Sequence, residues 1–174
     1  MIEVALGPDH PAYRMHRPRW SFQPLSCAGA ANSGGRLNRQ GVDALYLSLE
    51  TDTAVAEYRQ EDPLVRPGLL VAYRVTLSRV VDFRAGYNPA QWPPLWQDLE
   101  CNWKRLAFYD RIEPPSWGIA DVVRSAGFAG ILFPSTRRAG GVNLVVYSDQ
   151  LTAEDQLIPN DPSGELPADQ SSWT

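Results

Sequence analysis

The chain has 174 residues, 44% of them hydrophobic and 21% charged, which suits one globular domain and excludes a disordered chain. Its formal net charge of -4 argues against general nucleic-acid binding. The charge is unevenly spread, because residues 141–174 carry six acidic side chains and no Lys or Arg, whereas residues 1–40 and 101–140 are each net basic.

The sequence contains no recognisable targeting segment and no run of about 20 apolar residues of the kind that spans a membrane. We therefore expect a cytoplasmic protein that contacts neither a membrane nor nucleic acid directly. Cys27 and Cys101 are far apart and lack metal-ligand spacing, so we expect two buried thiols in a reducing compartment.

Apolar patterning and turn residues predict the elements of the first half of the chain. In chain order these are a short extended segment at 12–16, a strand at 44–49, a helix from Thr51 or Asp52 to about Gln60, and a strand at 69–77 that 80–83 continue after a turn.

A tryptophan-rich segment follows. Pro93-Pro94 are expected to open a helix, because apolar residues then recur every three or four positions. These residues are Leu95, Leu99, Trp103 and Leu106. Trp92, Trp96 and Trp103 either stack on a ligand or partner or belong to the core, and the core interpretation is favoured.

Another helix is expected to begin at Ser116 as its N-cap and to stop at Gly127. Its predicted inward face comprises Ile119, Val122, Val123 and Ala126. Two further strands are expected at 129–133 and 143–147.

The mixture of strands and helices lacks a regular βαβ rhythm, which favours an α+β fold with a small mixed, largely antiparallel sheet and flanking helices. We expect residues 1–150 to form this domain. Residues 151–174 are expected to be an acidic, Pro-containing tail draped on the surface or partly disordered.

Several common catalytic motifs are missing from the sequence. It has no phosphate-binding loop, no G-x-G-x-x-G and no H-E-x-x-H, and its two histidines, His10 and His16, cannot form a metal site alone. This shifts attention to chemistry carried by Arg, Glu, Tyr and Ser.

One polar constellation stands out. Gly34 and Gly35 precede Arg36, whose planar guanidinium suits a phosphate or carboxylate, and Glu57 is predicted on the inward face of the helix that begins near residue 51. An inward carboxylate needs a partner, and Arg36 is the nearest candidate. The alternative is a solvated Arg in a turn and a Glu on the helix surface.

A second group of polar residues surrounds the last strands. Ser135 follows a buried strand and is placed to hydrogen-bond a substrate, while Arg137 or Arg138 is placed to meet a phosphate. Asn143 opens the final strand as a further candidate. Each of these has an ordinary alternative as part of a turn.

Taken in order, these motifs resemble the RES domain family, the toxin half of bacterial RES–Xre toxin–antitoxin pairs. The resemblance covers about residues 12–150. It rests on Gly34-Gly35-Arg36-Leu37-Asn38, Ala44-Leu45-Tyr46-Leu47-Ser48, Ala54-Val55-Ala56-Glu57, Phe133-Pro134-Ser135 and Asn143-Leu144-Val145-Val146-Tyr147. Leu37 departs from the pattern, since many relatives carry an aromatic residue there.

The resemblance implies an ADP-ribosyltransferase-like fold that binds NAD as its substrate and cleaves the nicotinamide–ribose bond without a metal. It assigns catalysis to Arg36, Tyr46, Glu57 and Ser135, and NAD binding to Arg36, Tyr46, Ser48, Ser135, Arg137 and Asn143.

The resemblance also implies an Xre-like antitoxin as partner. The tryptophan-rich insert points to the ParT-type branch, which transfers ADP-ribose to a protein such as phosphoribosyl pyrophosphate synthetase. Two alternatives remain open at this stage. One is an NAD glycohydrolase or NAD phosphorylase, and the other is a non-catalytic module that binds an anionic ligand or a partner.

Overall fold

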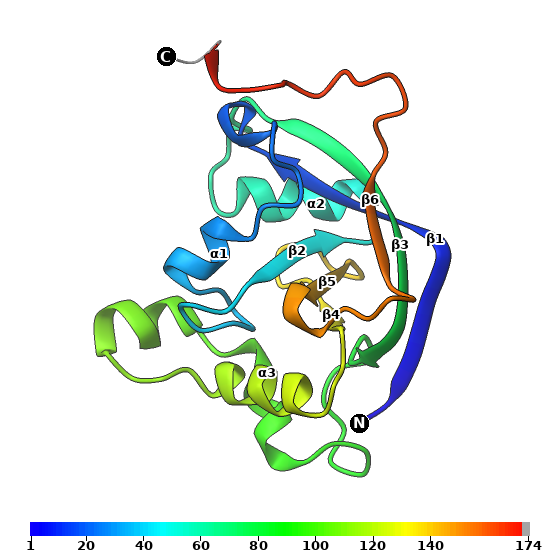
Figure 1. The fold of residues 1–174 in the computed structure, drawn as a ribbon. Coiled ribbons are helices and arrows are strands. Elements are labelled where there is room, and N and C mark those ends of the chain that lie inside the picture. The colour runs from blue at the N-terminus through cyan, green and yellow to red at the C-terminus, as the bar shows by residue number, and fades with distance from the viewer. Residues whose placement is uncertain (172–174) are drawn as a thin grey trace.

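The computed structural model describes residues 1–171 as a single α+β unit (Figure 1). The strands are β1 (Glu3–His16), β2 (Ala44–Ser48), β3 (Leu69–Asp82), β4 (Gly130–Pro134), β5 (Val142–Tyr147) and β6 (Gln156–Pro159). The α-helices are α1 (Ala28–Ser33), α2 (Thr51–Arg59) and α3 (Pro115–Ser125). Short helical segments are η1 (Pro18–Trp20), η2 (Pro94–Glu100), the π-helical η3 (Arg105–Asp110) and η4 (Ser148–Gln150).

The sheet is closed into a barrel. Its strands pair in the order β1-β2-β5-β4-β3, and β3 pairs again with β1, which removes both free edges of this set. Among the pairings of residues 1–171, only β3–β4 is parallel. The predicted α+β class with a largely antiparallel sheet is therefore confirmed, whereas closure of the sheet was not predicted.

Two strands are longer than the sequence suggested. The extended segment expected at 12–16 is the end of β1, which begins at Glu3, and the two strands expected at 69–83 are one continuous strand, β3. Pro8 and Pro11 lack amide donors and mask the strand signal in β1. The long antiparallel pairing with β3 nevertheless holds this segment extended, with register shifts on both sides of Leu6.

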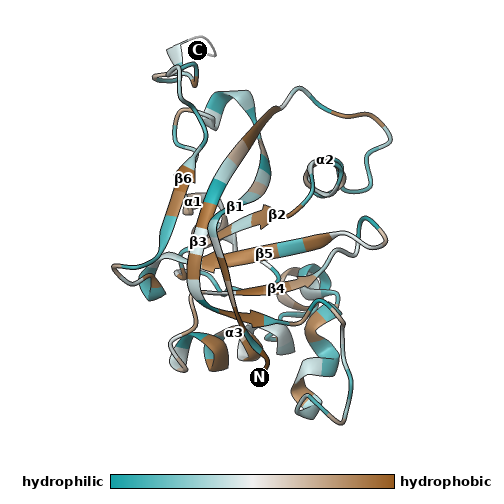
Figure 2. Cartoon of the chain, turned by 90° about the vertical axis from the view of Figure 1, so that its right-hand side faces the viewer, coloured by the Kyte–Doolittle hydropathy of each residue, from teal (hydrophilic) through white to brown (hydrophobic). Residues whose placement is uncertain are grey.

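The barrel has a core on each side of its sheet. Alternate residues of β3, including Tyr73 and Val75, are buried with apolar residues of β2 and β5. The other core joins the sheet to η2 and α3, where the ring centroids of Trp92 and Trp96 lie 4.4 Å apart. Figure 2 shows the apolar stretches of β2, β5 and β4 side by side.

The tryptophan-rich segment is not one continuous helix. η2 ends at Glu100, Cys101 is extended, and η3 begins only at Arg105. Trp92 and Trp96 are buried, as the core interpretation predicted, but Trp103 is half-buried beside the break. Of the four residues in the predicted apolar spacing, Leu99 is buried, Trp103 and Leu106 are half-buried, and Leu95 is exposed. The spacing was therefore wrong about helical continuity and only partly right about burial.

The start of α3 also differs from the prediction. Its N-cap residue is Pro114, and Ser116 lies inside the helix, where its hydroxyl donates to the Arg36 carbonyl at 2.5 Å instead of capping. Val122 and Ala126 are exposed, so the buried face is Ile119, Ala120 and Val123 together with Ser116.

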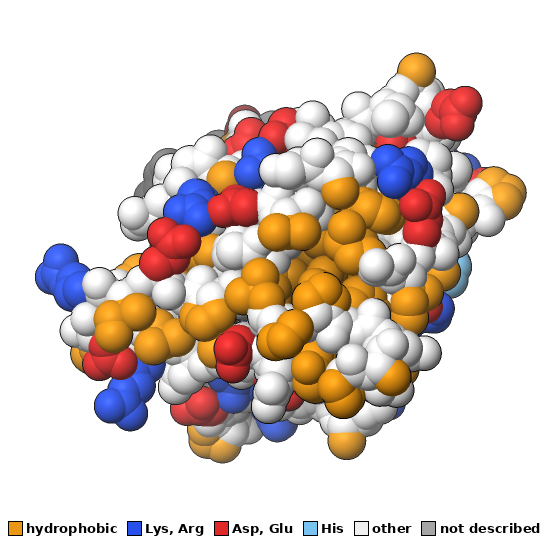
Figure 3. All heavy atoms as spheres, turned by 90° about the horizontal axis from the view of Figure 1, so that it is seen from below, with side chains coloured by type: hydrophobic (Ala, Val, Ile, Leu, Met, Phe, Trp, Pro, Cys, Tyr) orange, Lys and Arg blue, Asp and Glu red, His pale blue; other side chains and the backbone are white. Residues whose placement is uncertain are grey.

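Because Val122 lies on the outward face of α3, this part of the molecule carries apolar side chains on its surface. Val122 is 48% exposed and Leu95 of η2 is 39% exposed. Figure 3 shows hydrophobic side chains gathered on the face seen from below, the end at which α3 lies in Figure 1. Contiguous apolar surface of this kind commonly marks a site of protein contact.

The segment expected to be an acidic tail contributes to the sheet. β6 pairs antiparallel with β3, with Ile158 opposite Arg74, and the Asn160 amide donates to the Ala72 carbonyl at 2.8 Å. Asp155 also accepts two hydrogen bonds from Ser78, from its amide and its hydroxyl. Residues 155–160 are thus packed on the barrel.

Within residues 1–171, none of the helices is both long and apolar enough to span a bilayer.

Both cysteines are free and half-buried, where buried thiols were expected. Desolvation raises the pKa of the Cys27 thiol, which favours its protonated and unreactive form.

His16, at the end of β1, is buried against Tyr73 with 2.6 Å between Nε2 and the hydroxyl oxygen. The Tyr73 hydroxyl donates its single proton to the Pro24 carbonyl at 2.8 Å, so His16 Nε2 must be the donor in the first contact. Desolvation, with a further contribution from Arg14, lowers the pKa of His16 from 6.5 to about 4.

This shift predicts a pH-dependent stability. In the unfolded chain His16 takes up a proton below about pH 6.5, whereas in the folded chain it stays neutral until about pH 4. The free energy of unfolding should fall as the pH drops through this window, by about 3 kcal/mol at most. Urea unfolding from pH 7.5 to 4.5 measures it. His16→Gln, which keeps a donor toward Tyr73, should remove most of the slope, and an unchanged slope would contradict the assignment.

Candidate active site

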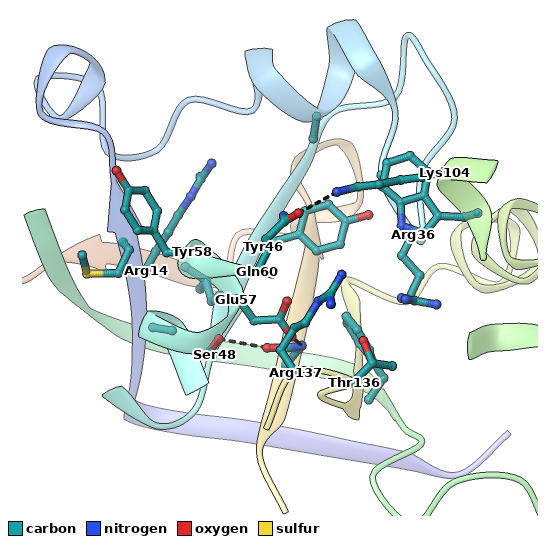
Figure 4. A pocket seen from close by; sticks show the side chains of 18 of the residues that line it. Arg14, Arg36, Tyr46, Ser48, Glu57, Tyr58, Gln60, Lys104, Thr136 and Arg137 are labelled. Atoms are coloured by element: carbon teal, nitrogen blue, oxygen red, sulfur yellow. Dashed lines mark hydrogen bonds between the residues drawn. The ribbon is translucent and has the colours of Figure 1, made fainter. Parts of the chain in front are cut away.

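A cavity of about 870 Å³ opens between the barrel and the segment that joins η2 to η3 (Figure 4). Its walls come from β1, the loop after α1, β2, α2, residues 100–104 and the ends of β4 and β5. Its volume falls within the range of small-molecule sites. The sequence-predicted residues that line it are Arg36, Tyr46, Ser48, Glu57, Arg137 and Asn143.

Glu57 lies at the centre of a fixed polar network. Its Oε1 accepts hydrogen bonds from Ser135 Oγ at 2.7 Å and from Asn143 Nδ2 at 2.6 Å. Ser48 Oγ donates in turn to Asn143 Oδ1 at 2.9 Å, which orients the amide. Within residues 1–171, no hydrogen bond reaches Glu57 Oε2. One oxygen of the carboxylate is therefore held by two donors, and the other is available to a ligand.

Ser135 is close to Glu57 but faces it rather than the cavity. Its hydroxyl oxygen also accepts the amides of Arg137 and Arg138 at 3.1 and 3.2 Å, so the turn after β4 fixes its orientation. Ser135 is not among the residues that line the cavity, while its neighbour Thr136 is. The structure thus places Ser135 as a group that orients Glu57.

Arg36 does not pair with Glu57, contrary to the expectation from sequence. Its Nη1 donates to the carbonyls of Leu99 and Cys101 at 3.1 and 3.0 Å. The turn after Gly35 directs the side chain toward the end of η2, and Ser135 and Asn143 satisfy Glu57 instead. Nη1 uses both its hydrogens on these carbonyls, so Nε and Nη2 remain for a ligand.

Tyr46 anchors the loop that carries Arg36. Its hydroxyl accepts the Leu37 amide at 2.9 Å and donates to Asn38 Oδ1 at 2.8 Å. Burial raises the pKa of Tyr46 well above its usual value, so the hydroxyl stays protonated and can donate. Leu37, where the resemblance led us to expect an aromatic residue, is fully buried in the core near α3.

Three other residues that hold this loop were given no role in the site by the sequence, in which Asn38 was only part of a motif and Ser116 only an expected N-cap. Asn38 donates through Nδ2 to the carbonyls of Ala30, Arg39 and Val42. From α3, Ser116 and Trp117 donate to the carbonyls of Arg36 and Gly35. The carbonyls that Ser116 and Trp117 bind are 80 and 82 positions away along the chain, so no local sequence pattern reveals these two contacts.

These contacts make Gly35 intolerant of a side chain. A Cβ at this position would lie 2.5 Å from both the Tyr46 hydroxyl oxygen and Asn38 Oδ1, and both side chains are pinned by other hydrogen bonds. We expect Gly35→Ala to lower the free energy of unfolding by about 1–3 kcal/mol and to displace Arg36. Gly29→Ala is the matched control, since its Cβ would meet nothing within 4 Å. Chemical denaturation of both variants tests this, and equal stabilities would refute it.

The two cations predicted near the last strands, Arg137 and Arg138, lie in different places in the structure. Arg137 lines the cavity and forms an ion pair with Glu61 at 3.1 Å, whereas Arg138 pairs with Asp52 at 3.7 Å and is not part of the wall. The structure adds Lys104, whose Nζ donates to Gln60 Oε1 at 2.7 Å and which joins residues 100–104 to the end of α2. It also adds Arg14, near the end of β1, and Arg17, directly after it. Among residues 1–171 no cluster of three or more metal-type side chains is found.

The chain that forms this barrel and its carboxylate-lined cavity matches a known family in sequence. The sequence model of the RES domain family matches residues 11–169 of this chain. The chain therefore belongs to the RES domain family. The family match extends past residue 150 and includes β6.

A chain of the crystal structure of the M. tuberculosis MbcT–MbcA toxin–antitoxin complex is similar in fold, with a TM-score of 0.57 and 20% sequence identity. The similarity covers 92% of this chain and 84% of that chain. Among curated proteins, none matches the chain in sequence.

Proposed function

We propose that this protein is the toxin of a bacterial type II toxin–antitoxin system and that it cleaves the nicotinamide–ribose bond of NAD, on an ADP-ribosyltransferase-like fold. The observation that carries the proposal is the half-satisfied carboxylate of Glu57 inside a cavity large enough for a dinucleotide. Membership of the RES domain family and fold similarity to a chain of a toxin–antitoxin complex support it.

The chemistry fits the residues. Loss of nicotinamide builds positive charge on the ribose, as in the oxocarbenium-like transition state of glycosidases. Glu57 Oε2 is the free carboxylate oxygen, and it stabilises that charge and holds the ribose hydroxyls. Ser135 and Asn143 keep the carboxylate in place, so no reorganisation is needed as the charge develops.

Arg36 and Tyr46 act on the other parts of the dinucleotide. The Nε and Nη2 donors of Arg36 bind the pyrophosphate, which positions the bond to be cleaved. The Tyr46 ring forms a wall for nicotinamide or ribose, while its hydroxyl holds the Arg36 loop. Ser48 contributes by orienting Asn143, and Arg137, which is paired with Glu61, lines the cavity near Glu57 as a further contact for NAD (Figure 4).

For the fate of ADP-ribose we propose transfer to a protein acceptor of the phosphoribosyl pyrophosphate synthetase type, as in the ParT-type branch. Incubation of the purified protein with NAD labelled in the adenylate part tests the whole scheme. Nicotinamide release with label on a protein band supports transfer. Free ADP-ribose or its phosphate ester supports NAD glycohydrolase or NAD phosphorylase activity, and no nicotinamide release leaves only a binding module.

An Xre-like antitoxin is the partner that this proposal requires. The hydrophobic surface in Figure 3 and the exposure of Leu95 and Val122 support contact with another protein. Co-expression with the neighbouring gene should relieve growth arrest caused by the chain alone. Arrest that the neighbour fails to relieve, or no arrest at all, would count against the toxin assignment.

A further inference from the structure

The break between η2 and η3 turns one tryptophan away from the core. Trp96 and Leu99 are buried, and in a continuous α-helix Trp103 would follow them on the same face. Cys101 is instead extended, with a ψ of 155°, so the chain leaves the helical path before it reaches Trp103. Trp103 is half-buried, and it lines the cavity of the candidate active site.

Two neighbours hold the Trp103 ring at the cavity wall. The Phe108 ring of η3 forms a T-shaped contact with it, with 5.9 Å between ring centroids, and Lys104 Nζ lies 5.8 Å from the indole centroid. Lys104 Nζ also donates to Gln60 Oε1 at 2.7 Å, which ties this wall to the end of α2. Trp103 is therefore a flat, partly accessible aromatic surface that loses little side-chain freedom when a ligand binds.

Arg36 places this surface beside the proposed position of the pyrophosphate. Its Nη1 donates to the Cys101 carbonyl at 3.0 Å, two residues before Trp103, and its Nε and Nη2 are assigned above to the pyrophosphate. A dinucleotide extends from its pyrophosphate in two directions, and in the proposed function the nicotinamide ribose takes the one toward Glu57. Figure 4 shows Arg36 and Lys104 together on one side of Glu57. The wall that carries Lys104 is thus the one left for the adenosine.

We propose that Trp103 stacks on the adenine ring of NAD and makes the cavity select a dinucleotide over a mononucleotide. Adenine is uncharged and aromatic, and a base that stacks on an aromatic side chain gains affinity without a matching set of hydrogen bonds. The proposal rests on the proposed function for the identity of the ligand. It separates Trp103 from Trp92 and Trp96, which belong to the core.

Binding of ADP and of inorganic pyrophosphate tests the stacking without any turnover. In isothermal titration calorimetry with the full chain, Trp103→Ala should weaken ADP binding about tenfold or more. Pyrophosphate carries the anionic groups without the base, so its affinity should be the same in both proteins. Trp103→Phe, which keeps an aromatic ring, should recover most of the ADP affinity, whereas Trp103→Leu, which keeps only apolar bulk, should not. Trp20→Ala is the matched control, because Trp20 is 53% exposed outside the cavity wall and its loss should change neither affinity.

Equal ADP affinity in the wild type, Trp103→Phe and Trp103→Leu would overturn the proposal. A loss of pyrophosphate binding that matches the loss of ADP binding would also overturn it, and so would the absence of ADP binding to the folded wild type. Thermal melting identifies a variant that fails to fold. If Trp103→Ala fails to fold, the comparison of Trp103→Phe with Trp103→Leu decides.

Kinetics with a truncated substrate separate this proposal from the proposed function. Nicotinamide mononucleotide keeps the bond to be cleaved and lacks the adenylate. Trp103→Ala should raise the KM for NAD about tenfold with kcat near the wild-type value, and it should leave turnover of nicotinamide mononucleotide unchanged. An equal effect on both substrates would contradict an adenine contact. Absence of nicotinamide release by the wild type would count against the proposed function alone, because Trp103-dependent ADP binding does not require cleavage.

Discussion

Glu57→Gln should reduce nicotinamide release from NAD by at least about 100-fold while leaving the fold intact. The substitution is nearly isosteric, and the Gln carbonyl oxygen can accept the same hydrogen bonds from Ser135 and Asn143 that Oε1 accepts. An amide then replaces the free carboxylate oxygen in the cavity. The variant therefore removes negative charge where the ribose becomes positive and changes little else.

The measurement is nicotinamide release under saturating NAD, with thermal melting of each protein alongside. Glu61→Gln is the matched control, because Glu61 also lines the cavity but pairs with Arg137 at a largely exposed position. It should retain most activity. Turnover by Glu57→Gln equal to the wild type would remove Glu57 from the mechanism.

Loss of the Ser135 hydroxyl should give a smaller effect of the same kind. In Ser135→Ala, Asn143 remains as a donor to Oε1, so the carboxylate keeps its charge and loses part of its orientation. We expect about tenfold slower release, with a KM for NAD near the wild-type value, because Ser135 is not part of the cavity wall. A large rise in KM alone would instead indicate direct substrate contact.

The largest effect on stability is expected at Gly130, the first residue of β4. A Cβ there would overlap the carbonyl oxygen of Val145 on the neighbouring strand β5. Both strands are buried inside a closed barrel, so neither backbone can move aside cheaply. Gly130→Ala should lower the free energy of unfolding by more than about 3 kcal/mol, a large part of the roughly 5–15 kcal/mol that stabilises an ordinary domain.

Urea unfolding followed by circular dichroism measures this loss, with Gly29→Ala again as the control in open space. If the two alanine variants unfold at the same urea concentration, then β4 and β5 are not packed as described. An intermediate loss of about 1 kcal/mol would mean that the barrel relaxes at this point.

Much of the candidate site was predictable because its signals are local. Two glycines before Arg36 indicate a tight loop, and helical periodicity places Glu57 on the same face as buried Thr53 and Ala54. The strand Ala44–Ser48 and the strand 143–147 were also recognised, the latter beginning one residue earlier in the structure. Each prediction depends only on residues a few positions apart.

The partners of those residues depend on the fold. Periodicity shows that Glu57 faces inward, but only the pairing of β2 with β5 places Ser48 beside Asn143 and both beneath α2. Arg36 was matched to Glu57 by charge, whereas the structure commits it to carbonyls more than 60 positions away. Long-range contacts of this kind leave no pattern in a single sequence.

The charge distribution shows the same division. The acidic residues after position 140 set the net charge of -4, and composition alone correctly separated them from the basic stretches at 1–40 and 101–140. The ion pairs that form in the folded structure decide which arginines are available to a ligand. Arg138 is neutralised by Asp52 outside the cavity, while Arg14, which no motif singled out, lines it without a carboxylate partner in residues 1–171. The sequence thus determined the family and the central carboxylate, whereas the packing of loops and strands in the tertiary structure determined which cations surround it.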